Sequence, residues 1–259
     1  MQNTKKTLSK LFIASIFFAV IFTAFRILLI SLNFDFESGF FANKTIATCY
    51  YVLVIAVSVF FYFVKKKSTK DTFGISNSVF SIVLSLLFIA LTLTAPAKDP
   101  LATPLEAAMS YIALVSGVMY AFHYIIYAFN KNKSLIALTN IFPVIFFISK
   151  STIIFMNQSV QANTYYSFSN SISLIALAFA LLYEGKALID SSEKRLLSLR
   201  LVTFFAVTQS VVPDLYFFIK DKLTLSFSEI ITTVIQFTYV LYFIFKTFKT
   251  ITSDSEDKI

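Results

Sequence analysis

Residues 19–41 read AVIFTAFRILLISLNFDFESGFF, which sets one basic residue inside a run of apolar ones. Arg26 lies in the last third of an apolar stretch that ends near residue 32, and a short acidic loop with Asp35, Glu37 and Gly39 follows. A cation inside a lipid-spanning helix is costly, and such residues usually face the interior of a helix bundle. This stretch therefore predicts a membrane helix whose arginine finds partners elsewhere in the chain.

The composition of the whole chain is typical of a membrane protein. Of its 259 residues, 57% are hydrophobic and 14% are charged, whereas soluble proteins carry roughly 25% charged residues. A single cysteine, Cys49, excludes an internal disulfide framework. The net charge of +8 would suggest a nucleic-acid partner for a soluble protein. Here we expect the lipid bilayer as the main partner and no nucleic acid.

Eight apolar segments are long enough to cross a bilayer, which takes about 20 residues per helix. The first segment is longer than the core of a secretory signal and has no Ala-x-Ala cleavage site near its end. We therefore predict an all-α membrane protein, one integral membrane domain over 1–259, with a short disordered cytoplasmic tail at 252–259. The eight transmembrane helices are predicted at residues 11–32, 45–64, 76–95, 106–129, 135–156, 170–188, 199–219 and 227–248.

The basic residues are distributed unevenly between the two sides of these helices. If residue 1 lies inside, sixteen of the 22 Lys and Arg residues fall in inner segments and four in outer segments, while Arg26 and Lys150 lie within helices. Inner loops of membrane proteins carry an excess of Lys and Arg. We therefore predict a multi-pass protein of the cell membrane with a cytoplasmic N-terminus and a cytoplasmic C-terminus.

The two halves of the chain have similar helix spacing. Arg26 falls on Lys150 when the sequence is shifted by 124 residues, and the first four predicted helices then overlap the last four. This pattern predicts two parallel four-helix repeats, 8–130 and 132–252. Transporters built from repeats place their sites at the repeat interface. The alternative is a series of eight helices of similar length without duplication.

Three ionisable residues lie at a similar depth below the outer membrane surface. Arg26, Lys150 and Asp214 are each roughly 8–9 Å from the outer ends of their helices at a rise of about 1.5 Å per residue. Pro213 lacks a backbone N–H and frees the carbonyl of Gln209, four residues earlier. Freed polar groups of this kind are tolerated where they are buried in protein or line water.

A second proline, Pro143, should act in the same way on the carbonyl of Thr139, beside Asn140.

Two interpretations of the three charges remain open. In the first, Asp214 pairs with Arg26 or Lys150 as a structural ion pair, and the other cation extends to the outer surface. In the second, Arg26, Lys150, Gln209 and Asp214 line an outward-facing polar cavity that binds a small anionic or zwitterionic solute. Asp35 is a further candidate, because its loop could fold down and offset the positive charge.

A second candidate cluster lies near the inner surface. His123 is close to the inner end of its predicted helix, and Glu184 is close to the inner end of another. A His–Glu pair can relay protons through a membrane protein. The alternative is that His123, which lies among tyrosines, belongs to the aromatic belt at the membrane interface.

Signatures of an enzyme are scarce in this sequence. Cys49 and His123, the only residues of their types, are predicted near opposite membrane surfaces, so they cannot form a catalytic dyad. One histidine and one cysteine do not make a zinc site with nitrogen and sulfur ligands. The four glycines form no phosphate-binding loop. We expect no catalytic residues, no metal and no cofactor.

Two short stretches resemble a pattern in uncharacterised bacterial multi-pass membrane proteins. The first is Arg26 followed by DFESGFF at 35–41, and the second is LLYEGK at 181–186, which leads through Arg195 to Val212-Pro213. The resemblance implies a bacterial eight-helix membrane protein and no particular activity. It marks Asp35, Gly39, Glu184 and Pro213 as residues to examine.

The sequence favours transport or binding of a small polar solute. The alternative is a non-catalytic membrane sensor or accessory subunit that acts through a membrane protein partner. A closed internal polar cavity would favour the first interpretation. Polar side chains that face lipid and lack partners would favour the second.

Overall fold

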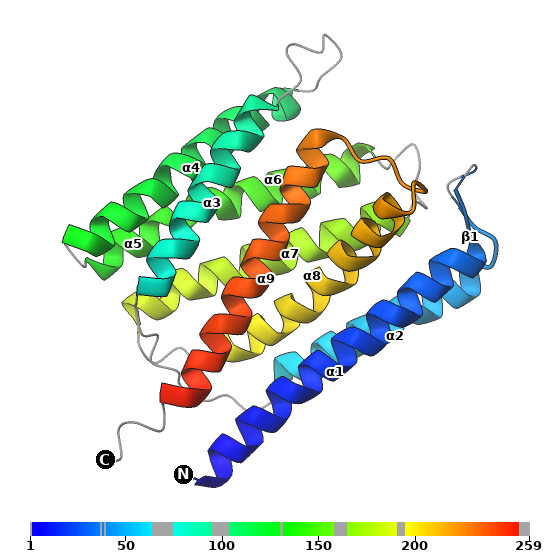
Figure 1. Cartoon of the computed structure of the whole chain (residues 1–259), viewed down its shortest axis with the longest axis horizontal. Helices are drawn as coiled ribbons and strands as arrows, with labels where there is room; N and C mark the ends of the chain where they lie inside the picture. Colours follow the sequence, from blue (N-terminus) through cyan, green and yellow to red (C-terminus); the bar gives the residue numbers. More distant parts are fainter. Residues whose placement is uncertain are drawn as a thin grey trace.

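The computed structural model describes residues 2–36, 38, 40–63, 75–94, 104–129, 132–157, 165–190 and 195–253. Within them, α-helices form an elongated bundle (Figure 1). The helices are α1 (Gln2–Asn33), α2 (Lys44–Phe63), α3 (Ile75–Leu93), α4 (Pro104–Phe129), α5 (Lys133–Thr139), α6 (Ile141–Asn157), α7 (Tyr165–Ile189), α8 (Leu196–Ile219) and α9 (Phe227–Ser253). A two-stranded ribbon, β1 (Phe34–Asp35) and β2 (Phe40–Phe41), joins α1 to α2.

The helices confirm an all-α protein, and their length and composition suit a multi-pass membrane protein. Seven segments of the described chain are long and apolar enough to span a bilayer, and α5 and α6 together form one of them (Lys133–Met156). The apolar part of α3 is shorter, Ser78–Leu93. Large apolar side chains on the outside of the bundle, such as Leu32 and Phe63, suit contact with lipid acyl chains.

The first helix is longer than predicted, because α1 starts at Gln2 rather than at residue 11. Polar and basic residues do not stop a helix; they only move it out of the hydrocarbon region, and the apolar part begins at Ser9. At the other end of the chain, α9 continues to Ser253. The predicted disordered tail therefore loses its first two residues to a helix, and residues 254–259 lie outside the described part.

The fifth predicted helix is interrupted at Asn140, where α5 ends and α6 begins. Asn140 keeps a right-handed helical conformation, with φ −71° and ψ −14°. Pro143 has no backbone N–H, so the carbonyl of Thr139 lacks the usual donor four residues further on. This missing donor explains the local break in a segment that otherwise continues as one membrane span.

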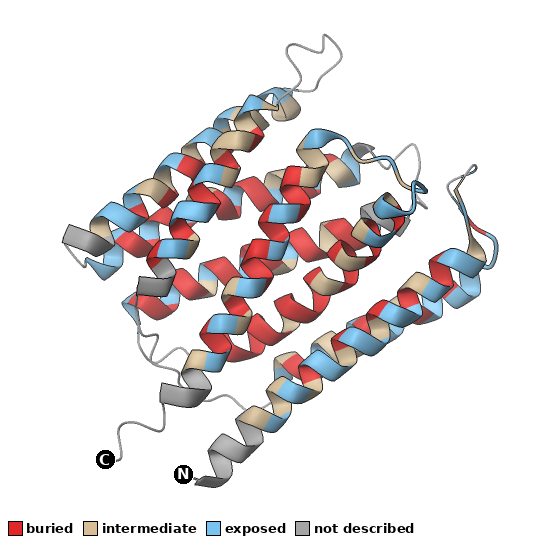
Figure 2. Ribbon diagram, viewed as in Figure 1, coloured by how far each residue is buried: buried red, intermediate tan, exposed pale blue. Residues whose placement is uncertain are grey.

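α8 is the central helix of the bundle. In the most apolar 18-residue part of α8, 83% of the residues are buried, whereas 22% are buried in the corresponding part of α2. α8 packs against α1, α2, α7 and α9. The pair α1–α2 lies along one side of the bundle and the pair α3–α4 along the other (Figure 1). Figure 2 shows the buried residues concentrated on α7, α8 and α9.

The two predicted repeats have different helix neighbours. In the second half, α7 packs against both α6 and α8, whereas in the first half α2 packs against α1 and α8, and α3 packs against α4 and α9. Repeats related by a single rotation would give equivalent helices equivalent neighbours. The contacts therefore lend no support to repeats at 8–130 and 132–252, and the duplication stays a prediction.

The ribbon after α1 folds over the end of α8. Phe34 pairs with Phe41 and Asp35 with Phe40 in antiparallel register. The ring of Phe36 packs on that of Phe217 with centroids 5.4 Å apart, and the Lys222 ammonium lies 5.7 Å from the Phe36 centroid. Of the predicted acidic loop, Glu37 and Gly39 lie outside the described residues.

Candidate functional site

Arg26 is fully inside the bundle, with 1% of its surface exposed. Its Nη1 donates hydrogen bonds to the backbone carbonyl of Gln209 on α8 and to Oγ of Ser169 on α7. The Gln209 carbonyl is the group that Pro213 deprives of its helical partner. Arg26 of α1 therefore satisfies the backbone acceptor that the proline of α8 leaves open.

The side chain of Gln209 ties three helices together. Its Nε2 donates to the Ala19 carbonyl and to Thr23 Oγ1 of α1, both at 3.0 Å. Its Oε1 accepts a hydrogen bond of 2.6 Å from the hydroxyl of Tyr50 on α2. Both backbone and side chain of Gln209 thus hold the α1–α2 pair against α8.

Asp214 is buried one turn further along α8. Within the described part of the chain its carboxylate forms no ion pair, and its Oδ1 has no hydrogen-bond partner. Arg26 and Glu229 are the charged groups whose fields act on it. The structure therefore does not contain the direct contact that the structural-pair interpretation predicted.

Lys150 and Asp35 do not line the cavity that Arg26 lines. Lys150 is half-buried on α6, where the charges of Glu229 and Glu106 act on it. Asp35 is exposed in β1. Of the five residues predicted to bind a solute, the structure thus gathers Arg26, Gln209 and Asp214 around α8. A role in ligand binding stays a prediction for all five.

The space beside Arg26 is small. Arg26, Tyr50, Ser169 and Gln209 contribute to the lining of a cavity of about 20 Å³. A buried water needs roughly 10–15 Å³ of such space. The cavity therefore has room for about one water molecule, and Asp214 and Lys150 are not part of its lining.

The polar residues continue through the middle of the bundle. Nε2 of Gln236 on α9 lies 2.8 Å from Oδ1 of Asn170 and 3.3 Å from Oγ of Ser173, both on α7. Deeper in the bundle, the hydroxyl groups of Tyr120 on α4 and Tyr239 on α9 are hydrogen-bonded to each other. All five side chains are buried.

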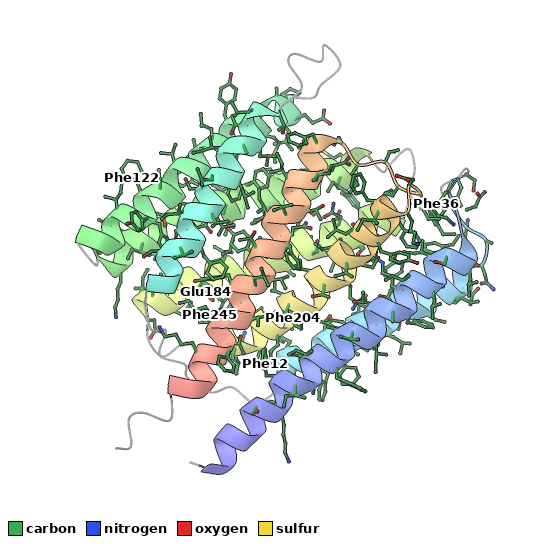
Figure 3. The ribbon with its side chains drawn as sticks, viewed as in Figure 1. Phe12, Phe36, Phe122, Glu184, Phe204 and Phe245 are labelled. Carbon is green, nitrogen blue, oxygen red and sulfur yellow. The ribbon has the colours of Figure 1, made fainter. Side chains whose placement is uncertain are left out.

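A buried ion pair lies in the half of the bundle nearer to the two termini. Glu184 of α7, labelled in Figure 3, accepts a hydrogen bond of 2.6 Å from Nε of Arg200 on α8. Lys246 of α9 is also buried, and its ammonium lies 5.6 Å from the centre of the Tyr242 ring. Glu184 thus has Arg200 as an ion-pair partner, which the sequence interpretation, with its expected pairing of Glu184 and His123, did not foresee.

The hydrogen bonds of His123 assign its tautomer. The Thr139 hydroxyl donates to the Ile136 carbonyl at 2.7 Å and lies 2.9 Å from Nδ1 of His123. A hydroxyl has a single proton, so here it accepts from Nδ1–H. The hydrogen-bond network therefore assigns a proton to Nδ1.

His123 and Glu184 line the same small cavity. Its volume is about 20 Å³, and Asn140, Tyr120 and Tyr239 also line it. This volume suits about one water molecule, which would lie between the imidazole and the carboxylate. His123 is 6% exposed, so it does not belong to an aromatic belt at the surface. The proton relay stays a prediction, and the geometry brings its two residues to one place.

We call a set of eleven buried polar residues along α7, α8 and α9 the central polar stripe. Its members are Ser169, Asn170, Ser173 and Glu184 of α7, Arg200, Thr203, Gln209 and Asp214 of α8, and Gln236, Tyr239 and Lys246 of α9. The three helices contact one another. One end of the stripe contacts Arg26 through Gln209 and Ser169. The other end holds the Glu184–Arg200 pair.

The sequence interpretation missed several of these residues. Arg200 and Lys246 are two of the sixteen basic residues that the predicted topology places in the inner segments, because they lie near helix ends. The available signal for Arg200 was that a short connection joins its helix to the one with Glu184, which places both at a similar depth. Tyr50 and Ser169 carried no signal, since one tyrosine or serine in an apolar helix is ordinary.

No protein-family model, curated protein or solved structure matches this chain.

Proposed function

We propose that the chain is an eight-span membrane protein that binds and moves a small anionic or zwitterionic solute along the central polar stripe. One observation carries this proposal: Arg26, Asp214, Glu184, Arg200 and Lys246 all turn inward and are at most 3% exposed. Ionisable residues within membrane helices usually mark pathways for ions or substrates.

The sign of the buried charge supports an anionic partner. Among the described residues, the buried formal charges are three cations and two carboxylates, which leaves a net charge of +1 when His123 is neutral. An anion, or the carboxylate of a zwitterion, would offset this excess.

The small size of the cavities along the stripe supports a conformation that is closed to solute. The cavities beside Arg26 and Glu184 each hold about one water. The α1–α2 pair attaches to α8 through the hydrogen bonds of Arg26, Gln209 and Tyr50. A solute would therefore enter when this pair moves away from α8 at the end that holds Arg26.

Replacing Gln236 by leucine should reduce transport with little effect on folding. Hydrogen bonds between membrane helices contribute about 0.6 kcal/mol on average, so the variant should remain folded. If solute passes the stripe, uptake should fall at least about fivefold, because a buried polar contact left unmade costs about 1–3 kcal/mol. The measurement is uptake of radiolabelled phosphate, glutamate and glycine into proteoliposomes.

Lys220→Gln is the control for loss of a positive charge, because Lys220 is exposed at the C-terminal end of α8 and lies outside the stripe. It should leave uptake unchanged. Lys150→Gln tests the predicted ligand residue that lies on α6, outside the stripe. Loss of uptake in Lys150→Gln together with full uptake in Gln236→Leu would move the solute site to the outer end of α6. Absence of uptake for all three probes in the unaltered protein would favour the second function, a non-catalytic sensor or accessory subunit.

We further propose a location in a bacterial cell membrane with both termini in the cytoplasm. The asymmetry of Lys and Arg supports this orientation, and α3, with 19 residues, is long enough to serve as the eighth span. A reporter fused after Lys258 should be cytoplasmic, and one inserted at Asp99 should be external. Labelling of Lys258 from the outside, or of Asp99 from the inside, would contradict the eight-helix topology.

A further inference from the structure

A groove opens on the outside of the bundle between the α5–α6 segment and the second half of α7. Its volume is about 250 Å³. Its walls include Leu138, Ile141, Leu182 and Ile189, all of which are exposed large apolar residues. In a membrane-spanning bundle, an exposed apolar wall faces acyl chains rather than water.

The shape of the groove follows from two local features. Asn140, where the helix is interrupted, lies in the wall and separates α5 from α6. Gly185 allows α7 to approach α5 closely, because a Cβ atom at this position would lie 3.3 Å from the Ala137 carbonyl oxygen. The interruption and the glycine together leave a hollow beside a tight helix contact.

One end of the groove is basic. Lys186 is the charged residue of its lining, and the lining residue Ser134 directly follows Lys133, the exposed first residue of α5. Asp190, one turn beyond Lys186, is exposed. The attraction between two exposed charges of this kind is at most about 1 kcal/mol, so the carboxylate of Asp190 does not prevent Lys186 from binding an anion. The polar groups of Ser134 and Asn140 lie in the same wall.

We propose that this groove binds one anionic phospholipid, with an acyl chain along the apolar wall and the phosphate at Lys186. Basic pockets between membrane helices bind anionic headgroups in this way. The site is separate from the central polar stripe, although Asn140 and Leu181 line both the groove and the cavity beside Glu184.

The proposal is tested by native mass spectrometry of the full chain with phosphatidylglycerol or phosphatidylcholine at equal concentration. The unaltered protein should retain one phosphatidylglycerol molecule in preference to phosphatidylcholine. Lys186→Gln should weaken this binding about fivefold, the contribution of one lysine near a membrane surface. Ile189→Trp, which fills the groove and keeps its charge, should also weaken it.

Lys249→Gln is the matched control, because Lys249 lies on α9 toward the same end of the bundle and is not part of the groove lining. It should bind phosphatidylglycerol as the unaltered protein does. Equal losses in Lys186→Gln and Lys249→Gln would show general surface attraction and overturn the site. Full binding by Ile189→Trp would overturn it as well, because the lipid would then lie outside the groove. Equal retention of the two lipids by the unaltered protein would also exclude the proposal.

Discussion

Glu184→Gln is expected to lower the free energy of unfolding by about 3–5 kcal/mol, the typical cost of breaking a buried ion pair. The substitution keeps the size of the side chain but removes the charge that faces Arg200, 2.6 Å away. Arg200 is 1% exposed and Lys246 is 2% exposed. Both cations would then remain in a low-dielectric interior without this carboxylate.

A double variant shows whether the lost stability comes from the unpaired charge of Arg200 or from changed side-chain packing. Glu184→Gln combined with Arg200→Met should recover most of the lost stability, because a buried pair replaced by uncharged residues of similar volume is often neutral. Glu229→Gln is the control for loss of a carboxylate, since Glu229 is only half-buried and glutamine can replace it in the capping interaction with Ser226. Unfolding by SDS in mixed micelles measures all four proteins. A single-variant loss below that of Glu229→Gln would show that the pair does not stabilise the fold.

Arg26→Met is the second substitution with a large expected effect, also about 3–5 kcal/mol. It removes the donor to the Gln209 carbonyl and the cation whose field acts on Asp214. An unsatisfied buried carbonyl alone costs about 1–3 kcal/mol. The carboxylate of Asp214, with an Oδ1 that has no hydrogen-bond partner, accounts for the remainder.

Pro213→Ala should partly rescue Arg26→Met. Alanine restores a backbone N–H at position 213, and this donor can bond to the Gln209 carbonyl within α8. We expect a recovery of about 1–3 kcal/mol in the double variant, again measured by SDS-induced unfolding.

Pro143→Ala is the matched control in the Arg26→Met background. It makes the same chemical change in a buried proline, but the carbonyl it satisfies belongs to Thr139 and not to Gln209. It should therefore give no rescue that is specific to the loss of Arg26. Equal recovery with Pro213→Ala and Pro143→Ala would mean that Arg26 does not serve the freed carbonyl of α8.

Much of the fold could be predicted from local sequence because lipid imposes a simple rule. Backbone groups inside a bilayer must bond within their own helix, so length and hydropathy alone located each helix to within a few residues for most segments. The same local chemistry predicted the effects of both prolines. Pro143 interrupts the helix at Asn140, and Pro213 frees the Gln209 carbonyl that Arg26 occupies.

Partner choice could not be predicted in this way. Depth along a helix placed Arg26, Lys150 and Asp214 at one level, but depth does not say which helices are neighbours. The structure puts Arg26 beside α7 and α8 and leaves Lys150 near Glu229 and Glu106. For the same reason, the pairing of Glu184 with Arg200 was missed, although the predicted topology places both residues near the same membrane surface.

The sequence by itself determined that the chain is a helical membrane protein, where its helices lie, and that Arg26 must face the bundle interior. These properties follow from the free-energy cost of placing a charge or an unbonded backbone group in lipid. Each segment incurs this cost independently of its neighbours. Only the tertiary structure decided that α8 is central, that Arg26 caps the carbonyl freed by Pro213, and that Glu184 pairs with Arg200. These contacts depend on how separate helices pack, and a helix in lipid can present the same polar face to any of several neighbours.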